Sequence, residues 1–331
     1  MRARASTLAL AAVLAATSCS LSVEPAGTLV QPGMSPMARR YVDEFLGLLQ
    51  AHSINRLTID WPAVRAKAEK LAPTAQTIVD THPILQDAMI ALRDGHSTFR
   101  ASNGRFFYYP LRTCVRSNAG VPTALPADVG YVRVGTFSGG GPGGVAFADS
   151  IQAIIRAADR DGLSGWIVDL RSNGGGNMWP MLAALSPILG DELLGHFVDP
   201  TGVVTAWDVR DGAARMAGVV QQVATSPYRL KRERPRVAVL TDNAVASSGE
   251  AVAIAFRARP DTRTFGLATC GQSTANASFV LSDGSLLNLT VATMADRTRR
   301  AYGDQVAPDE VVQDADEIVR RAVAWLQQPA S

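Results

Sequence analysis

The chain has 331 residues, with 32 Lys and Arg against 30 Asp and Glu, so its net charge is only +2. This length permits one large or two modest domains with a substantial core. The near balance of charge argues against a nucleic-acid-binding protein, which usually has a basic excess. A composition that is 47% hydrophobic and 19% charged is typical of a globular protein and excludes wholesale disorder.

Residues 1–18 are typical of a secretory signal, with two early arginines, an apolar run from Leu8 to Ala16, and small residues before Cys19. The apolar run is much shorter than the ~20 residues that span a bilayer. Cys19 resembles the lipidated cysteine of bacterial lipoproteins, and plain cleavage near Ser18 is the alternative. We expect an exported protein of the bacterial cell envelope, in the periplasm or on the outer surface, with membrane contact only through this anchor.

Residues 19–36 are rich in proline and glycine and are predicted to form a tether. From Met37 onward, apolar residues recur at helical spacing, and further helical stretches follow at Trp61–Leu71 and Ala75–Leu92. We therefore predict a small helical N-terminal domain over residues 37–92 and a second domain over residues 93–331.

The second domain alternates strands with helices, which indicates an α/β fold. The predicted strands cover Gly130–Val134, Trp166–Leu170 and Val237–Leu240. Helices are predicted over Phe147–Ala158, around Met181–Leu185, from about Ser248 to Arg257, and from Asp314 to the end of the chain. The glycines of residues 139–144 are predicted to form a loop, and this loop lacks the Gly-Lys-Ser/Thr ending of a phosphate-binding site.

Two cysteines besides Cys19 occur in the chain, Cys114 and Cys270. In an oxidising compartment they could pair, or they could be two buried free thiols, and the sequence leaves both possibilities open. No Cys/His cluster has the spacing of metal ligands, so we expect neither a metal nor another cofactor.

Ser247 follows a predicted strand and stands where a helix begins, a place that exposes a hydroxyl near free backbone N–H groups. An ordinary helix N-cap with Glu250 completing a capping box is the alternative interpretation. Further segments favour the catalytic interpretation: Asp94-Gly95-His96-Ser97, Asp169-Leu170-Arg171-Ser172-Asn173-Gly174-Gly175-Gly176, Phe265-Gly266 and Val306-Ala307-Pro308-Asp309.

Together with Ala246-Ser247-Ser248-Gly249-Glu250, these segments make the chain similar to the carboxy-terminal processing (tail-specific) serine peptidases. That family includes the tricorn core protease and the interphotoreceptor retinoid-binding protein repeats. The resemblance covers roughly residues 37–325. It implies a ClpP/crotonase-like ββα catalytic domain behind the small helical domain.

The resemblance implies that Ser247 is the nucleophile, and that the amides of Ser248 and of Gly175 or Gly176 form the oxyanion hole. Many members of the family use a lysine 25 residues after the serine, but Gln272 stands there and no lysine follows Lys231. The Ser-Lys mechanism is therefore excluded.

His96 remains as the predicted general base of a Ser-His-acid site, with a structural role as the alternative. The resemblance to the tricorn-like branch implies an acid in the segment before Pro308-Asp309, here residues 296–304, where Asp296 and Asp304 are both candidates.

Residues 98–129 are too few for a PDZ domain, so we expect the helical domain to cover the cleft. The predicted function is that of an exported serine endopeptidase acting on peptides or unfolded proteins. A non-catalytic protein that binds peptides or hydrophobic ligands on the same fold is the main alternative, and a hydrolase of another ester or amide is a third.

Overall fold

The computed structural model describes residues 33–110, 112–115 and 120–329. The predicted signal, Cys19 and most of the tether lie outside the described residues. Within the described ranges, no helix is both long enough and apolar enough to cross a membrane.

A five-stranded parallel sheet forms the centre of the larger part of the molecule. Its strand order is β13 (Glu310–Val311), β10 (Thr262–Gly266), β9 (Val237–Thr241), β4 (Gly165–Asp169) and β3 (Val129–Arg133). Every residue of β4 and β9 is buried, because helices cover both faces. The predicted α/β class is confirmed.

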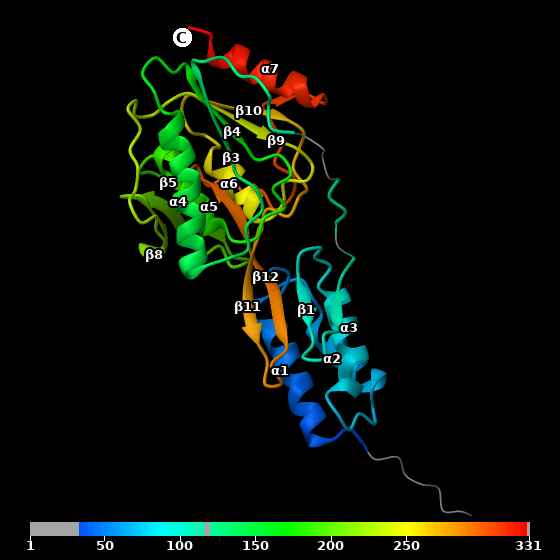
Figure 1. The fold of residues 1–331 in the computed structure, drawn as a ribbon. Coiled ribbons are helices and arrows are strands. Elements are labelled where there is room, and N and C mark those ends of the chain that lie inside the picture. Colours follow the sequence, from blue (N-terminus) through cyan, green and yellow to red (C-terminus); the bar gives the residue numbers. More distant parts are fainter. Residues whose placement is uncertain (1–32, 111, 116–119, 330–331) are drawn as a thin grey trace, which may run out of the picture.

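The two faces of this sheet carry different helices (Figure 1). Val132, Val168 and Val239 pack under α4 (Gly141–Ala158), α5 (Met178–Leu189) and α6 (Ser248–Ala255). Ile167 and Leu240 point the opposite way, toward α7 (Ala315–Leu326). Helix α4 begins inside the predicted glycine loop, because Pro142 fits the first turn of a helix, where no N–H donor is needed.

A second, antiparallel sheet runs beside the first. It contains β2 (Phe106–Tyr108), β1 (Thr98–Arg100), β12 (Leu286–Asp296), β5 (Leu193–Val198), β6 (Val204–Arg210), β7 (Ala213–Met216) and β8 (Val219–Gln222), and β11 (Thr274–Val280) pairs with β12. The long strand β12 pairs with β1 at one end and with β5 at the other. It therefore connects the helical part of the molecule to the larger part that contains the parallel sheet, as Figure 1 shows.

The helical part contains α1 (Pro36–His52), α2 (Trp61–Leu71), the 3₁₀ turn η1 (Val79–Thr81) and α3 (His82–Ala91). Its core extends beyond the predicted residues 37–92, because Phe99, Phe107, Leu287 and Leu289 pack with the apolar face of α1 and α3. The tip of the β11–β12 hairpin is thus part of this core. Between His96 and β3, the described residues form β1, β2 and irregular chain, with no PDZ domain.

Candidate active site

Ser247 stands at the junction between β9 and α6, on a sharply turned backbone. Its φ of 52° lies in the left-handed region that non-glycine residues rarely adopt. Its N–H donates to the Glu250 carboxylate at 2.9 Å, so the glutamate half of a capping box holds the strained turn in place. The turn leaves the Ser247 hydroxyl free to face His96.

His96 lies in the loop between α3 and β1, and its Nε2 is 3.0 Å from Ser247 Oγ. Its Nδ1 is 2.8 Å from Thr274 Oγ1 at the start of β11. Burial lowers the pKa of His96 to about 4, and the nearby Asp94 carboxylate opposes this shift. The imidazole is therefore neutral at pH 7 and able to accept a proton.

Asp94 organises the loop that carries His96. Its carboxylate accepts the N–H groups of His96 (3.1 Å) and Ser97 (2.6 Å), and also the hydroxyls of Ser97 and Thr290. These contacts give the aspartate of the Asp-x-His-Ser pattern a structural role. It fixes the backbone of the loop that carries His96, whereas the imidazole nitrogens contact Thr274 and Ser247.

The structure brings neither Asp296 nor Asp304 to His96. Asp304 pairs with Arg112 at the surface, and Asp296 accepts hydrogen bonds from Thr298 and Tyr302 within its own turn. The expected acid is thus replaced at Nδ1 by the hydroxyl of Thr274, which sequence reasoning missed. Its contact with His96 depends on the register of β11 with β12, which cannot be read from the sequence.

Gln272, which stands where a catalytic lysine would be expected, also supports the histidine loop. Its Nε2 donates to Gly95 O at 3.3 Å, and Asn276 Nδ2 donates to His96 O at 3.1 Å. The side chains of residues 272, 274 and 276 thus all bind the loop at residues 95 and 96.

The loop after β4 approaches Ser247 closely. A Cβ added to Gly175, whose φ is +93°, would lie 2.6 Å from Ala246 O and 3.0 Å from Ser248 N, so only glycine fits there. The Gly175 N–H donates to Asn173 Oδ1 at 2.9 Å. Within the described residues, the N–H groups of Gly176 and Ser248 have no acceptor. Of the two predicted glycines, Gly176 is therefore the one whose amide is free to pair with that of Ser248.

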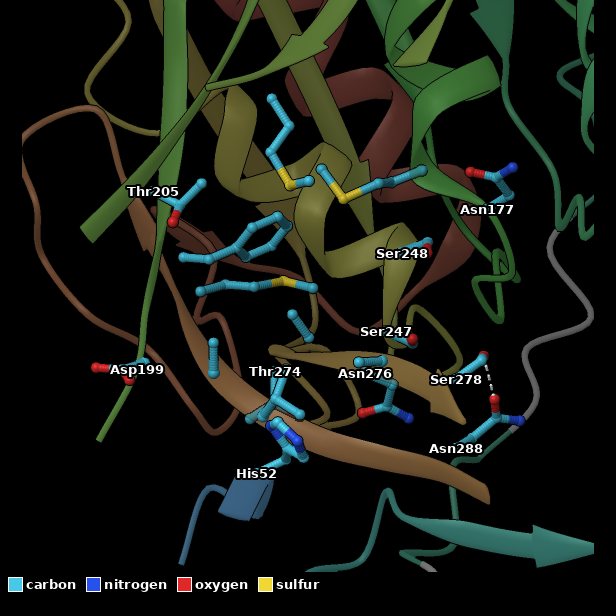
Figure 2. Close-up of a pocket in the computed structure, with 18 of the residues that line it drawn as sticks. His52, Asn177, Asp199, Thr205, Ser247, Ser248, Thr274, Asn276, Ser278 and Asn288 are labelled. Atoms are coloured by element: carbon cyan, nitrogen blue, oxygen red, sulfur yellow. Dashed lines mark hydrogen bonds between the residues drawn. The ribbon is translucent and has the colours of Figure 1, made fainter. Parts of the chain in front are cut away.

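A cleft of about 730 Å³ opens beside Ser247 and Ser248, between the helical part and the two sheets. Figure 2 shows Ser247, Thr274 and Asn276 along one side of it and Asp199 farther from Ser247. Much of the remaining wall is apolar, formed by Met178, Trp179, Phe197, Met216, Val291 and Met294. A cleft with an apolar wall and a few polar groups is suited to binding a peptide.

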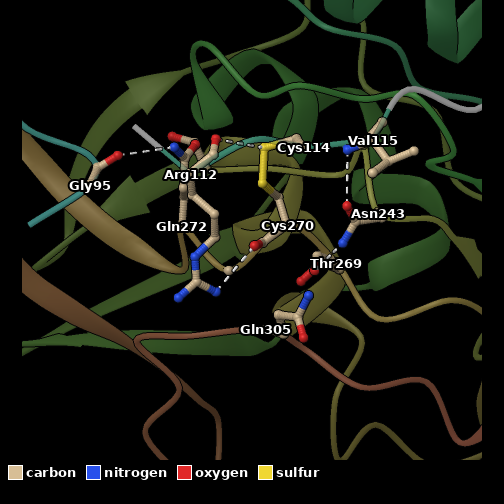
Figure 3. The surroundings of a disulfide bond; sticks show 12 residues. Gly95, Arg112, Cys114, Val115, Asn243, Thr269, Cys270, Gln272 and Gln305 are labelled. Carbon is tan, nitrogen blue, oxygen red and sulfur yellow. Dashed lines mark hydrogen bonds between the residues drawn. A yellow bond between two sulfur atoms is a disulfide. The ribbon is translucent and has the colours of Figure 1, made fainter. Parts of the chain in front are cut away.

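Cys114 and Cys270, whose pairing the sequence left open, form a disulfide with a Cα–Cα distance of 5.2 Å (Figure 3). The bond joins the segment after β2 to the loop that leads into β11. Nearby, Arg112 Nη1 donates to Cys270 O at 3.3 Å and Val115 N donates to Asn243 Oδ1 at 2.9 Å. The disulfide therefore anchors the loop from which Thr274 extends toward His96.

No group of three or more metal-ligating side chains occurs within the part of the chain that the structure describes. The chemistry available at the cleft is that of a hydroxyl, an imidazole and backbone N–H donors. This combination is the one that acyl transfer uses.

Comparisons with known proteins agree with this geometry. Over 293 residues, the chain is 25% identical to the nisin-resistance protein of Lactococcus lactis subsp. lactis, a match that covers 88% of both chains. Its fold is similar to that of a lipoprotein from Streptococcus agalactiae (TM-score 0.69, 23% identity, 89% of this chain and 97% of that chain). It is also similar to that of the photosystem II D1 C-terminal processing protease (TM-score 0.57, 16% identity, 87% and 98%).

A protein-family model matches residues 128–312, which include the glycine loop, the turn at Ser247 and all five strands of the parallel sheet. The match covers more than half of the chain and contains Ser247. Thus, the chain belongs to peptidase family S41.

Proposed function

We propose that the protein is an exported serine-type peptidase that hydrolyses peptide bonds through an acyl-enzyme on Ser247, with His96 as the general base. The observation that carries this proposal is the 3.0 Å contact between Ser247 Oγ and His96 Nε2 beside a peptide-sized cleft. This distance is within the range needed for proton transfer from nucleophile to base.

The reaction follows from the positions of the donors. As Ser247 Oγ bonds to the substrate carbonyl carbon, its proton moves to His96 Nε2. The N–H groups of Gly176 and Ser248 would stabilise the oxyanion, each such donor contributing roughly 10²–10³ in rate. When the C–N bond breaks, His96 gives the proton to the leaving amine, and water then releases the acyl group by the same route.

Nisin is the first peptide to test as a substrate, because the similarity to the nisin-resistance protein extends over 88% of both chains. The cleft also supports a peptide substrate physically. Its wall combines apolar side chains with a strand, β11, of which residues 274–278 all line the cleft. An extended peptide can hydrogen-bond to such a strand while placing its side chains against the apolar wall.

A non-catalytic binding role on the same fold is the second candidate. It is favoured by the lack of a carboxylate at His96 Nδ1, since a carboxylate would stabilise the imidazolium that catalysis requires. Both candidates use the same cleft, so they differ only in whether Ser247 is activated.

A fluorophosphonate probe distinguishes the two candidates. We expect wild-type protein to be labelled, and the Ser247→Ala and His96→Ala variants to lose labelling. Ser150→Ala, which removes an exposed hydroxyl that donates only to Phe147 O, is the matched control and should label normally. Absence of labelling in folded wild-type protein would favour the binding role.

Export and anchoring form a separate part of the proposal. They rest on residues 1–19 and gain support from the similarity in fold to a streptococcal lipoprotein. We expect wild-type protein in a bacterial host to fractionate with membranes and to incorporate a labelled fatty acid. The Cys19→Ser variant should lose the label, whereas unlabelled wild-type protein would indicate plain cleavage near Ser18.

A further inference from the structure

The imidazole of His96 has an unusual partner on the side away from the nucleophile. Its Nδ1 is 2.8 Å from the hydroxyl of Thr274, where a Ser-His-acid site would place a carboxylate. We propose that Thr274 is the positioning residue of the general base, and that this peptidase works with a Ser-His-Thr arrangement. The inference rests on the proposed function and identifies the third member of the same site.

The nearby carboxylates have other partners. Asp94 accepts four hydrogen bonds from the backbone and side chains of its own loop and of β12. Asp304 binds Arg112 and also accepts the N–H of Gln305 at 2.8 Å. Glu250 directs its carboxylate at Thr269 and at backbone amides. Each carboxylate thus binds other donors, and the group that contacts Nδ1 is the Thr274 hydroxyl.

Thr274 is held firmly enough to orient a ring. Its N–H donates to Gln272 O at 2.8 Å, and its Cα pairs with Thr293 on β12. The side chains of Gln272 and Asn276 bind Gly95 O and His96 O, and that of Thr274 contacts the His96 ring. The same short segment therefore contacts both the histidine backbone and its ring.

The Thr274 hydroxyl can accept a proton carried on Nδ1, so it is compatible with the tautomer that the reaction needs. With Nδ1–H donating to Thr274 Oγ1, the Nε2 lone pair is free to accept the proton of Ser247. After proton transfer, the imidazolium still donates Nδ1–H to the same hydroxyl. A neutral oxygen stabilises this cation less than a carboxylate would, because it adds no attraction between opposite charges.

The pH dependence of kcat/KM separates this role from a merely structural one. Asp94 is the charged group that acts on the His96 ring through space. The elements packed against the ring contribute the hydroxyls of Ser247 and Thr274, which do not titrate near neutral pH. Changes at position 274 should therefore move the acid limb of the profile in a direction set by the new side chain.

Four variants test the proposal on a reporter peptide. Thr274→Val, which keeps the shape and removes the hydroxyl, should lower kcat about tenfold, leave KM unchanged, and move the acid limb to lower pH. Thr274→Ser should restore wild-type behaviour to within about threefold. Thr274→Asp should move the acid limb to higher pH, because a carboxylate favours the imidazolium. Thr293→Val, the same change on the paired strand, should leave the profile unchanged.

Equal kcat/KM and equal pH profiles for wild type and Thr274→Val would overturn the proposal. So would equal losses in the Val and Ser variants with no shift of the acid limb, since that result indicates packing alone. Ser247→Ala measured alongside keeps the two proposals apart. If Ser247→Ala retains activity, the proposed function fails. If Ser247→Ala is inactive and the fluorophosphonate probe labels wild type, the proposed function stands, and the Thr274 variants then test the Ser-His-Thr arrangement alone.

Discussion

The carboxylate of Glu250 accepts the backbone N–H of Ser247 at 2.9 Å and, with the same two oxygens, binds the loop that leads to Thr274. In that loop it accepts the N–H groups of Gly271 at 2.8 Å and Gln272 at 2.7 Å, and also the hydroxyl of Thr269. One fully buried carboxylate thus fixes the nucleophile turn relative to the segment that supports His96.

Replacing Glu250 by glutamine should therefore reduce both stability and catalysis. In glutamine, an NH₂ group replaces one of the two oxygens that accept these hydrogen bonds, so two donors would face each other in a buried site. We therefore expect the free energy of unfolding to fall by about 2–4 kcal/mol. We expect kcat to fall at least tenfold. Urea denaturation and kcat on a reporter peptide measure the two effects. Glu44→Gln is the matched control, because Glu44 also accepts an N–H and a hydroxyl, both from Ser282, but at the surface. A stable and fully active Glu250→Gln variant would contradict the prediction.

Much of the fold could be predicted because its strands and helices have strong local patterns. The strand β4 lies within one residue of its predicted bounds, since a strand covered on both faces must be apolar throughout. Helix α2 matches its prediction, because Pro62 stands in its first turn and a charged face follows. The predicted stretch 75–92 divides into η1 and α3. Pro83 lies in the first turn of α3, where its missing N–H is not needed, whereas in the interior of one continuous helix it would remove a hydrogen bond.

The contacts that complete the site could not be predicted in this way. Thr274 lies 178 residues from His96 in the chain, and their contact depends on how β11 pairs with β12. Strand pairing of that kind is a tertiary property that sequence motifs do not reveal. The motifs direct attention to acids such as Asp304, which binds Arg112 instead of His96. The same long hairpin carries Leu287 and Leu289 into the core of the helical part, which no local pattern indicates.

The low pKa of His96 predicts how stability depends on pH. The folded-state pKa is about 4, below the usual value of 6.5, so the unfolded chain binds more protons between these values. Stability should therefore fall as pH drops from 6.5 toward 4, by roughly 3 kcal/mol from this residue alone. Urea denaturation from pH 4 to 8 measures the effect as the difference between wild type and His96→Gln. Parallel pH dependences in the two proteins would exclude it.

Loss of the disulfide should destabilise the protein and disturb the loop that carries Thr274. Cys114 and Cys270 are 156 residues apart, and a chain-entropy model assigns such a bond up to about 5 kcal/mol. We expect Cys114→Ser to lower the denaturation midpoint and kcat together. Wild type in dithiothreitol should behave like the variant, and the variant itself should not respond to the reductant. A reduced wild type that keeps its midpoint would show that the bond contributes little.

Arg56 and Asp199 connect the helical part to the antiparallel sheet at the wall of the cleft. Arg56 Nη2 lies 2.7 Å from Asp199 Oδ2, and both residues line the cleft. Arg56 belongs to the turn after α1 and Asp199 to the turn after β5. Hydrogen bonds from Thr201, together with Arg56, lower the pKa of Asp199 to about 2, so the carboxylate stays charged down to acidic pH.

Breaking this pair should widen the cleft and weaken substrate binding without changing the chemistry. We expect Arg56→Ala to raise KM several-fold and to leave kcat near the wild-type value, because Ser247 and His96 are held by other elements. Asp199→Ala and the double variant should raise KM no further, since all three remove the same link. Arg65→Ala, which breaks an exposed pair with Asp43 within the helical part, is the control and should leave KM unchanged. Additive effects of the two substitutions on KM would show that they act on the cleft separately.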